Sequence, residues 1–375
     1  MNDTVSRRWE LDALRGLMLA VMFATHLPTR YSNWMGQPLG FVSSAEGFVM
    51  LSAFVAGMVN TRRAQRNGLP AMRRAFFRRA LVVYACQVAC LLLLFTAIAA
   101  LGLKYGQPGL KNLIGFYLQH PLTGLWSSVL LIYNPPLLDI LPLYVLLLLL
   151  SPWVLAYGLQ RGWRGIFAVS ILLWLGAQFD MSARLYALLV AATGLPVPFR
   201  ETGSFEMYAW QLMWVFGLWL GSMEAQGVLR RRKPFSRGTV LMAVAIVVAG
   251  FVWRRAVGQT PFPGHDTWNF LFDKWHLGPL RLVNFLALLT LILHFGGRLS
   301  AGLPRLRFFE SLGAASLPVF CAHLVLVLLT LAVLGDDFNA RPGWGDPALL
   351  ATGLILLYLT ASLSAGWRHR MGRRI

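Results

Sequence analysis

The sequence predicts an all-α polytopic membrane protein with about ten transmembrane helices and both termini in the cytoplasm. Hydrophobic residues make up 57% of the chain, the mean hydropathy is +0.58, and apolar runs of membrane-spanning length recur from end to end. Basic residues gather in alternate connections between these runs, as the positive-inside rule requires. No connection is long enough for a soluble domain, so residues 1–375 are expected to form a single membrane-embedded domain.

The expected spans follow from the apolar runs in chain order. The first run contains Arg15 and His26 and no small-residue cleavage site follows it, so it is expected to remain as a helix rather than to be removed as a signal peptide. The segment 110–133 is apolar but is broken by Gln-His-Pro at 119–121, which favours an interfacial or re-entrant segment. The ten expected spans are 10–30, 43–60, 79–103, 137–159, 165–178, 206–224, 238–256, 280–297, 312–334 and 347–367.

The net charge of +19 is explained by this topology. With the N-terminus inside, 23 of the 34 lysines and arginines fall on the cytoplasmic side, seven of them between residues 62 and 79. On the outer side ten basic residues are nearly balanced by nine acidic ones. The excess charge is therefore a topology signal that suits anionic membrane lipids, and a nucleic-acid partner is not expected.

Titratable residues within the first apolar runs are the main candidates for function, because such groups are costly in lipid and usually face a bundle interior. Arg15 and His26 are eleven positions apart, roughly three helical turns, so they share one face with about 16 Å of rise between them. The topology places His26, Glu46 and Asp139 at one outer level, provided that their helices are neighbours. Ser43 and Glu46 also fit a capping box, so Glu46 is expected to cap its helix, to act in the site, or both. For His26 the simpler alternative is a polar contact between helices.

The connection between the second and third expected spans is basic and amphipathic. Arg74 and Arg78 are four positions apart, Arg79 follows, and two phenylalanines lie between them. Such a helix can lie at the membrane surface with its basic face available to anionic groups. Two interpretations stay open: contact with lipid head groups, or binding of the phosphates of a cytosolic donor, since arginine makes bidentate contacts with phosphate oxygens.

Aromatic and polar residues in the later segments point to the outer side. Trp210 and Gln211 lie in the aromatic-rich outer half of the span 206–224, and the next outer connection brings His276 and Arg281. Aromatic belts are routine at membrane interfaces, but sugars also stack on the faces of tryptophan and tyrosine. This connection is polar and aromatic enough to line an acceptor site.

Metal binding is not expected. Cys86 and Cys90 are four positions apart on one expected helix but lack a nearby second pair, so they are interpreted as packing residues.

His323 lies at mid-depth of the span 312–334, where a single histidine is either a structural hydrogen-bonding group or a site residue. No phosphate-loop, nucleophile-elbow or zinc-protease motif stands in a supporting context, so no bound cofactor is expected either.

Several segments together resemble the OpgC (MdoC) family, which is related to the acyltransferase-3 membrane proteins. The similarity runs in order along nearly the whole chain and is most specific around Arg15–His26, Glu46 and Asp139–Tyr144. The segments that carry it are LDALRGLMLAVMFATHLP, SSAEGFVMLSAF, NPPLLDILPLYVLLLLLSP, FEMYAWQLMWVFGLWLG, DKWHLGPLRLVNFLAL and LGAASLPVFCAHLVL.

The resemblance implies a ten-helix acyltransferase of the bacterial inner membrane. It would take a succinyl or other short acyl group from the corresponding cytosolic acyl-CoA, succinyl-CoA in the first case, and add it to hydroxyl groups of a periplasmic glucan. The acyltransferase-3 pattern of an arginine followed eleven positions later by a histidine falls on Arg15 and His26. The basic cytoplasmic motif falls, less cleanly, on Arg74, Arg78 and Arg79, which become the expected donor site.

The residue types suit this chemistry, because acyl transfer to a hydroxyl group needs a base and a means of stabilising an oxyanion. His26 is the natural base, with Glu46 or Asp139 orienting its other nitrogen and Arg15 stabilising negative charge on the donor. Direct transfer is the working hypothesis, and a covalent acyl-histidine stays open. The rival functions are a proton-coupled carrier of an acyl group or lipid-linked sugar and a structural partner of a glucan synthase. The residues expected around the acceptor are Tyr144, Trp210, Gln211, His276, Arg281 and His323.

Overall fold

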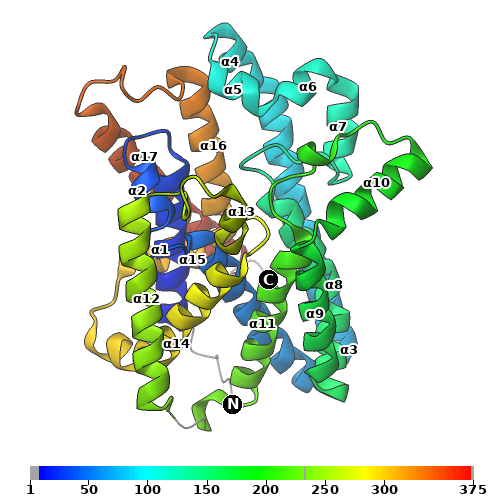
Figure 1. The fold of residues 1–375 in the computed structure, drawn as a ribbon, viewed down its shortest axis with the longest axis vertical. Helices are drawn as coiled ribbons and strands as arrows, with labels where there is room; N and C mark the ends of the chain where they lie inside the picture. Colours follow the sequence, from blue (N-terminus) through cyan, green and yellow to red (C-terminus); the bar gives the residue numbers. More distant parts are fainter. Residues whose placement is uncertain (1–7, 232–233, 373–375) are drawn as a thin grey trace.

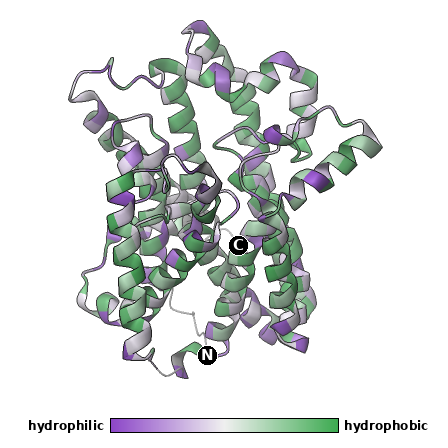
Figure 2. Cartoon of the chain, viewed as in Figure 1, coloured by the Kyte–Doolittle hydropathy of each residue, from purple (hydrophilic) through white to green (hydrophobic). Residues whose placement is uncertain are grey.

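The computed structural model describes residues 8–231 and 234–372, and the regular secondary structure of these residues is helical throughout. Long helices run side by side along the vertical axis of Figure 1, and short helices gather at its upper end. Figure 2 shows that hydrophobic residues dominate the long helices, while hydrophilic residues concentrate near their ends and in the connections. The all-helical prediction is confirmed, and the chain is a membrane protein.

The helices of the described residues alternate between long members and short connecting turns. One π-helical turn, η1 (Leu94–Ile98), links α3 to α4, and three 3₁₀ turns, η2 (Phe199–Glu201), η3 (Leu229–Arg231) and η4 (Phe270–Phe272), lie in connections. The α-helices are α1 (Trp9–His26), α2 (Ser32–Gly36), α3 (Ser44–Leu93), α4 (Ala99–Lys104), α5 (Pro108–Leu113), α6 (Gly115–Gln119), α7 (Pro121–Val129), α8 (Ile140–Arg161), α9 (Arg164–Ala177), α10 (Met181–Thr193), α11 (Met207–Ala225), α12 (Arg237–Val257), α13 (Asp266–Asn269), α14 (Pro279–Gly302), α15 (Arg307–Ala314), α16 (Ser316–Leu334) and α17 (Gly345–Gly372).

Each of the ten expected spans coincides with helix, but only six helices of the described residues are long and apolar enough to cross a membrane. One of the six is the continuous stretch Ser44–Lys104, which holds two of the expected spans. α1 carries three charged residues in its 18, and α9 has only 14 residues and is bent by 79° against α10. The total of about ten membrane crossings therefore stays a prediction.

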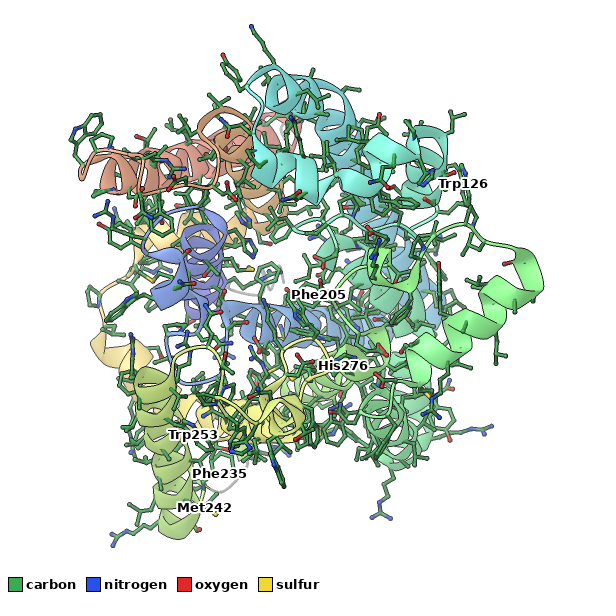
Figure 3. The ribbon with its side chains drawn as sticks, turned by 45° about the horizontal axis from the view of Figure 1, so that its top comes forward. Trp126, Phe205, Phe235, Met242, Trp253 and His276 are labelled. Atoms are coloured by element: carbon green, nitrogen blue, oxygen red, sulfur yellow. The ribbon has the colours of Figure 1, made fainter. Side chains whose placement is uncertain are left out.

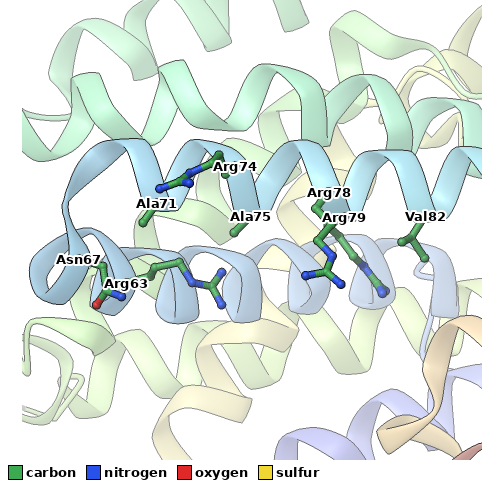
Figure 4. Close-up of a pocket in the computed structure, with 8 residues that line it drawn as sticks. All are labelled: Arg63, Asn67, Ala71, Arg74, Ala75, Arg78, Arg79 and Val82. Carbon is green, nitrogen blue, oxygen red and sulfur yellow. The ribbon is translucent and has the colours of Figure 1, made fainter. Parts of the chain in front are cut away.

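The helix α3 folds back on itself at Gly68. This residue has φ +79° and ψ 168°, a conformation that is strained for any residue with a side chain. Pro70 follows within the first turn of the second arm, where its missing N–H costs nothing. Phe48 and Arg79 line one small cavity, which requires the two arms to run antiparallel, and Figure 4 shows them side by side. The basic connection is helical, as expected, but it forms the ends of both arms of a hairpin rather than one separate helix, and its position at the membrane surface stays a prediction.

Close helix contacts in the core depend on glycine. A Cβ atom on Gly221 of α11 would lie 2.0 Å from the carbonyl oxygen of Phe54 in α3, and one on Gly16 of α1 would lie 1.9 Å from that of Phe309 in α15. Small residues let helix backbones approach each other where lipid supplies no hydrophobic driving force. These contacts hold α11 against α3 and α15 against α1, and so position the two helices that carry Glu46 and His26.

The segment 110–133 forms the short helices α5, α6 and α7 rather than one long span. These helices lie at the upper end of the molecule in Figure 1. Tyr117 stacks on Phe95 with ring centroids 4.0 Å apart, and Tyr84 donates a hydrogen bond to the carbonyl oxygen of Val129 at 2.9 Å. The segment is therefore packed against the second arm of α3, and its interfacial position in the membrane stays a prediction.

Candidate functional site

The centre of the candidate site is a pair of histidines. His26 is the last residue of α1, and its Nδ1 lies 3.0 Å from Nε2 of His323 in α16. The two rings are nearly parallel, with centroids 5.1 Å apart, while Phe23 and Phe320 pack edge-on against His323. His323 is fully buried, and its Nδ1 has no hydrogen-bond partner among the described residues. The partner that orients His26 is therefore a second histidine.

The carboxylates expected to orient His26 are bonded elsewhere. Glu46 is fully buried, accepts hydrogen bonds from the N–H and hydroxyl of Ser43 in the predicted capping box, and forms an ion pair with Arg281. Asp139 accepts a hydrogen bond from the backbone N–H of Ser204 at 3.0 Å. The capping-box prediction is confirmed. Neither carboxylate is hydrogen-bonded to His26, because Glu46 is paired with Arg281 and Asp139 is bonded to the backbone N–H of Ser204.

Lys274 interacts electrostatically with Glu46, Asp139 and Arg281 and was not predicted as a site residue. Its ammonium lies 4.4 Å from the ring centroid of Trp275 and 5.8 Å from that of Phe205. Burial lowers the pKa of Lys274, although the charges of Glu46 and Asp139 oppose this effect. It also interacts electrostatically with His26. The charges at this level of the molecule, Glu46, Asp139, Lys274 and Arg281, form what we call the outer ionic layer.

Arg15 lies deeper, as its position in α1 predicts. Its Nη2 donates to the hydroxyl of Ser52 at 3.4 Å. Together with Arg79, Tyr144 and Phe320 it lines a small cavity of about 30 Å³. Phe320 also packs against the ring of His323, so one side chain lies between this cavity and the histidine pair. Tyr144, expected near the acceptor, lines this small cavity together with Arg15 and Arg79.

The arginines expected to bind a donor gather around a larger cavity of about 620 Å³ between the arms of α3. Arg74, Arg78 and Arg79 line it from the second arm, and Arg63, which was not predicted, lines it from the first. In Figure 4, Arg78 and Arg79 extend from one arm towards the other. Met72, Phe76 and Ala80, spaced by four positions, are buried on the opposite face of the same helix. We call this the basic cavity; its lining residues are Arg63, Asn67, Ala71, Arg74, Ala75, Arg78, Arg79 and Val82.

Two residues expected to contact the acceptor are instead part of the core. Trp210 is fully buried and donates its indole N–H to the carbonyl oxygen of Trp275 at 2.9 Å. Gln211 is buried and exchanges hydrogen bonds with both the hydroxyl and the carbonyl oxygen of Ser170. Their polar atoms are occupied by contacts within the fold, so neither presents a face to a sugar. Arg281 and His323 are likewise buried, within the ionic layer and the histidine pair.

His276 is the predicted acceptor residue that lines an outer groove. This groove has a volume of about 570 Å³ and is also lined by Glu206, Tyr186, Phe205 and Trp275. Figure 3 shows Phe205 and His276 close together near the centre of the view. Aromatic faces beside polar groups are the surface that a carbohydrate requires, and pockets of this size hold small ligands.

An ion pair fixes the loop that carries His276. Its Nδ1 lies 2.7 Å from Oδ2 of Asp273, and its backbone N–H donates to the same oxygen at 2.8 Å. The hydrogen bond to Asp273 raises the pKa of His276, and the charges of Glu206 and Asp180 add to this effect. Burial alone raises the pKa of Asp273, but the hydrogen bonds from His276 outweigh it and lower that pKa.

The three cysteines, Cys86, Cys90 and Cys321, are free thiols that lie near one another. Among residues 8–231 and 234–372, no group of three or more histidine, cysteine or acidic side chains is placed to hold a metal ion. The geometry therefore directs attention to the histidine pair, the ionic layer and the basic cavity.

Comparison with known proteins supports one family assignment. The sequence model described as OpgC protein matches residues 7–370, nearly the whole chain. No curated protein and no solved structure matches the chain. The predicted resemblance to OpgC is confirmed, whereas the relation to the acyltransferase-3 proteins stays a prediction. The chain therefore belongs to the OpgC family, and the arrangement of His26, Arg15 and the α3 arginines is that of a member of this family.

Proposed function

We propose that this protein is a membrane O-acyltransferase that moves a succinyl group from succinyl-CoA to hydroxyl groups of a periplasmic glucan. Membership of the OpgC family supports a transferase that modifies glucans with succinyl groups. Coenzyme A enters as a donor substrate, and the glucan is the acceptor.

The observation that carries this proposal is that Arg15 and the arginines of α3 meet at one residue, Arg79. Arg79 lines both the basic cavity and the small cavity beneath the histidine pair. In this proposal the phosphates of the donor bind the arginines of α3, and its thioester arm extends past Arg15 and Tyr144 towards His26. Arginine suits this task because its planar guanidinium matches phosphate oxygens with two parallel hydrogen bonds.

The mechanism follows from the contact between the histidines. We assign the shared proton to Nδ1 of His26, which donates to Nε2 of His323 and leaves the lone pair of His26 Nε2 free. That nitrogen takes the proton of the acceptor hydroxyl while the hydroxyl oxygen attacks the thioester carbonyl carbon. The carbon–sulfur bond then breaks, and the thiolate of coenzyme A receives the proton from His26. Positive charge from Arg15 and the outer ionic layer stabilises the oxyanion that forms in between.

The proposed arrangement in the membrane places the basic cavity in the cytoplasm and the groove at His276 in the periplasm. It retains ten crossings of the bacterial inner membrane, with both termini inside. The distribution of the arginines supports this orientation, because seven of them lie between residues 62 and 79 at the turn of the α3 hairpin.

Replacement of His26 tests the function directly. We expect glucans from cells that express the wild type to carry succinyl esters, and His26→Ala to reduce them by about 10²- to 10⁴-fold because the base is lost. The measurement is mass spectrometry of periplasmic glucans at equal membrane levels of both proteins. His120→Ala, which removes an exposed histidine between α6 and α7, should leave the esters unchanged. Identical glucans from wild type and His26→Ala would refute the assignment and bring a proton-coupled carrier forward.

A further inference from the structure

A buried arginine in the outer ionic layer has hydrogen-bonding capacity that the fold does not use. Arg281 is 1% exposed; its Nε donates to Glu46, and its Nη1 lies 3.4 Å from the carbonyl oxygen of Phe272. Its Nη2 is buried and has no partner among the described residues. Buried polar groups are nearly always hydrogen-bonded, so an unpartnered guanidinium nitrogen points to an anionic ligand.

Lys274 supplies a second cation beside it. None of the ion pairs among the described residues includes Lys274, whose ammonium instead rests on the ring of Trp275. Its charge interacts with that of Arg281, and two like charges at one buried site favour an anion between them. The flexible stem of a lysine lets the ammonium leave an aromatic face for a carboxylate.

Two other cations assigned to the same side of the molecule are already paired. Arg30 and Arg341 both bind the buried carboxylate of Asp346, at 3.0 and 3.4 Å. Arg15 lies deeper, beside Ser52 and the small cavity. Lys274 also interacts electrostatically with His26, so its positive charge acts on the proposed base.

We propose that Arg281 and Lys274 bind the free carboxylate of a dicarboxylic acyl group while its thioester faces His26. In a succinyl thioester the free carboxylate is separated from the reacting carbonyl by two methylene groups, so both ends occupy neighbouring positions in one site. An acetyl group has no such carboxylate and leaves both cations unmatched. The pair therefore selects succinyl-CoA over acetyl-CoA. This inference rests on the proposed acyl transfer.

Lys274→Met tests the selection because methionine retains much of the apolar stem and removes the charge. The measurement is the release of coenzyme A by the purified full-length protein with glucan as acceptor and either succinyl-CoA or acetyl-CoA as donor. We expect the ratio of kcat/KM for succinyl-CoA to that for acetyl-CoA to fall roughly 10- to 100-fold, as for a lost charged hydrogen bond. Lys274→Arg should retain most of the preference.

Lys104→Met is the matched control, since Lys104 also lies over an aromatic ring, 5.8 Å from the centroid of Tyr105, but is exposed on α4. Its donor ratio should equal that of the wild type. An equal loss of kcat/KM with both donors in Lys274→Met would show a structural role and overturn the inference. An unchanged ratio would also overturn it.

A separate binding measurement distinguishes failure of the inference from failure of the proposed function. If the wild type transfers neither acyl group, the proposed function fails. Calorimetric titration with monomethyl succinate, which carries one carboxylate and a neutral ester, then tests the site alone. Binding by the wild type and Lys104→Met but not by Lys274→Met supports the carboxylate site, and equal behaviour of all three proteins refutes it.

Discussion

The basic cavity and the outer ionic layer are both charged, but they differ in how exposed their charges are and in whether these are paired with opposite charges. The cavity between the arms of α3 is lined by four arginines and no acidic residue, and Arg74 and Arg78 are exposed. The outer layer buries Glu46, Asp139 and Arg281 and half-buries Lys274, and its carboxylates face cations most closely in the pair of Glu46 and Arg281. The first region suits a polyanion that arrives and leaves, whereas the second holds fixed charges that depend on one another.

This difference predicts where substitutions damage the fold and where they damage only binding. Removing one member of a buried pair leaves an uncompensated charge in a medium that solvates it poorly. Removing an exposed arginine leaves a site that water fills, and it changes the free energy of unfolding little. The contrast is therefore sharpest when the same type of residue is removed from each region.

Arg281→Met should have the largest effect on stability. It leaves the carboxylate of Glu46 buried without its ion-pair partner, which costs about 3–5 kcal/mol of unfolding free energy. The measurement is thermal unfolding of the purified protein in detergent. The double variant Glu46→Gln with Arg281→Met should recover most of this loss, since glutamine keeps the capping interaction without the charge. Equal melting temperatures for wild type and Arg281→Met would contradict the account of a dependent buried pair.

Arg78→Ala should have a smaller effect, and this effect should be on donor binding and not on stability. We expect the KM for succinyl-CoA to rise about tenfold at low salt, because one charged contact to phosphate is lost, and the difference to shrink as salt screens the interaction. Steady-state kinetics at two salt concentrations measure this. The melting temperature should stay that of the wild type.

Arg66→Ala provides the control for Arg78→Ala. Arg66 belongs to the same basic segment and is exposed, but it does not line the cavity. Its removal should leave the KM unchanged. If both variants raise the KM equally, the effect comes from general surface charge rather than from a built donor site.

The two regions also differ in how far the sequence predicts them. The basic cavity could be found from local spacing, since Arg74, Arg78 and Arg79 lie within one helical segment. A reversal between the spans 43–60 and 79–103 was expected, but its sharp position at Gly68, which encloses the cavity, was not, because helical propensity continues on both sides of it. The Gly-Leu-Pro sequence at 68–70 is the signal that was available.

The outer layer could be predicted only in part, because its members come from α3, α14 and two connections. The capping box at Glu46 is local and was predicted correctly. The partners of Glu46 and His26 lie 235 and 297 residues away, and no periodicity within one helix identifies such pairs. Trp210 and Gln211 were expected to contact the acceptor but lie in the core, because aromatic and polar side chains in a membrane helix serve packing as well as sugar binding.

The smallest effect concerns the loop that joins the outer layer to the groove, and it depends on pH. The pair of His276 with Asp273 stabilises the folded state fully between about pH 4 and 6.5, the ordinary pKa values of the two groups. Because the pKa of His276 is raised in the folded state, this stability is lost as the pH rises through that higher value. Because the pKa of Asp273 is lowered, it is also lost as the pH falls through that lower value.

His276→Gln should remove this pH dependence. Relative to the variant, the wild type should melt at a higher temperature at pH 5.5 and lose that advantage by pH 8.5, where the imidazole is neutral. Since the two side chains are 40% and 28% exposed, the difference should not exceed about 1 kcal/mol. Unfolding curves of both proteins at the two pH values measure it. A wild-type advantage that grows towards pH 8.5 would mean that neutral His276 is the stabilising form, and the groove would then present an uncharged imidazole to its ligand.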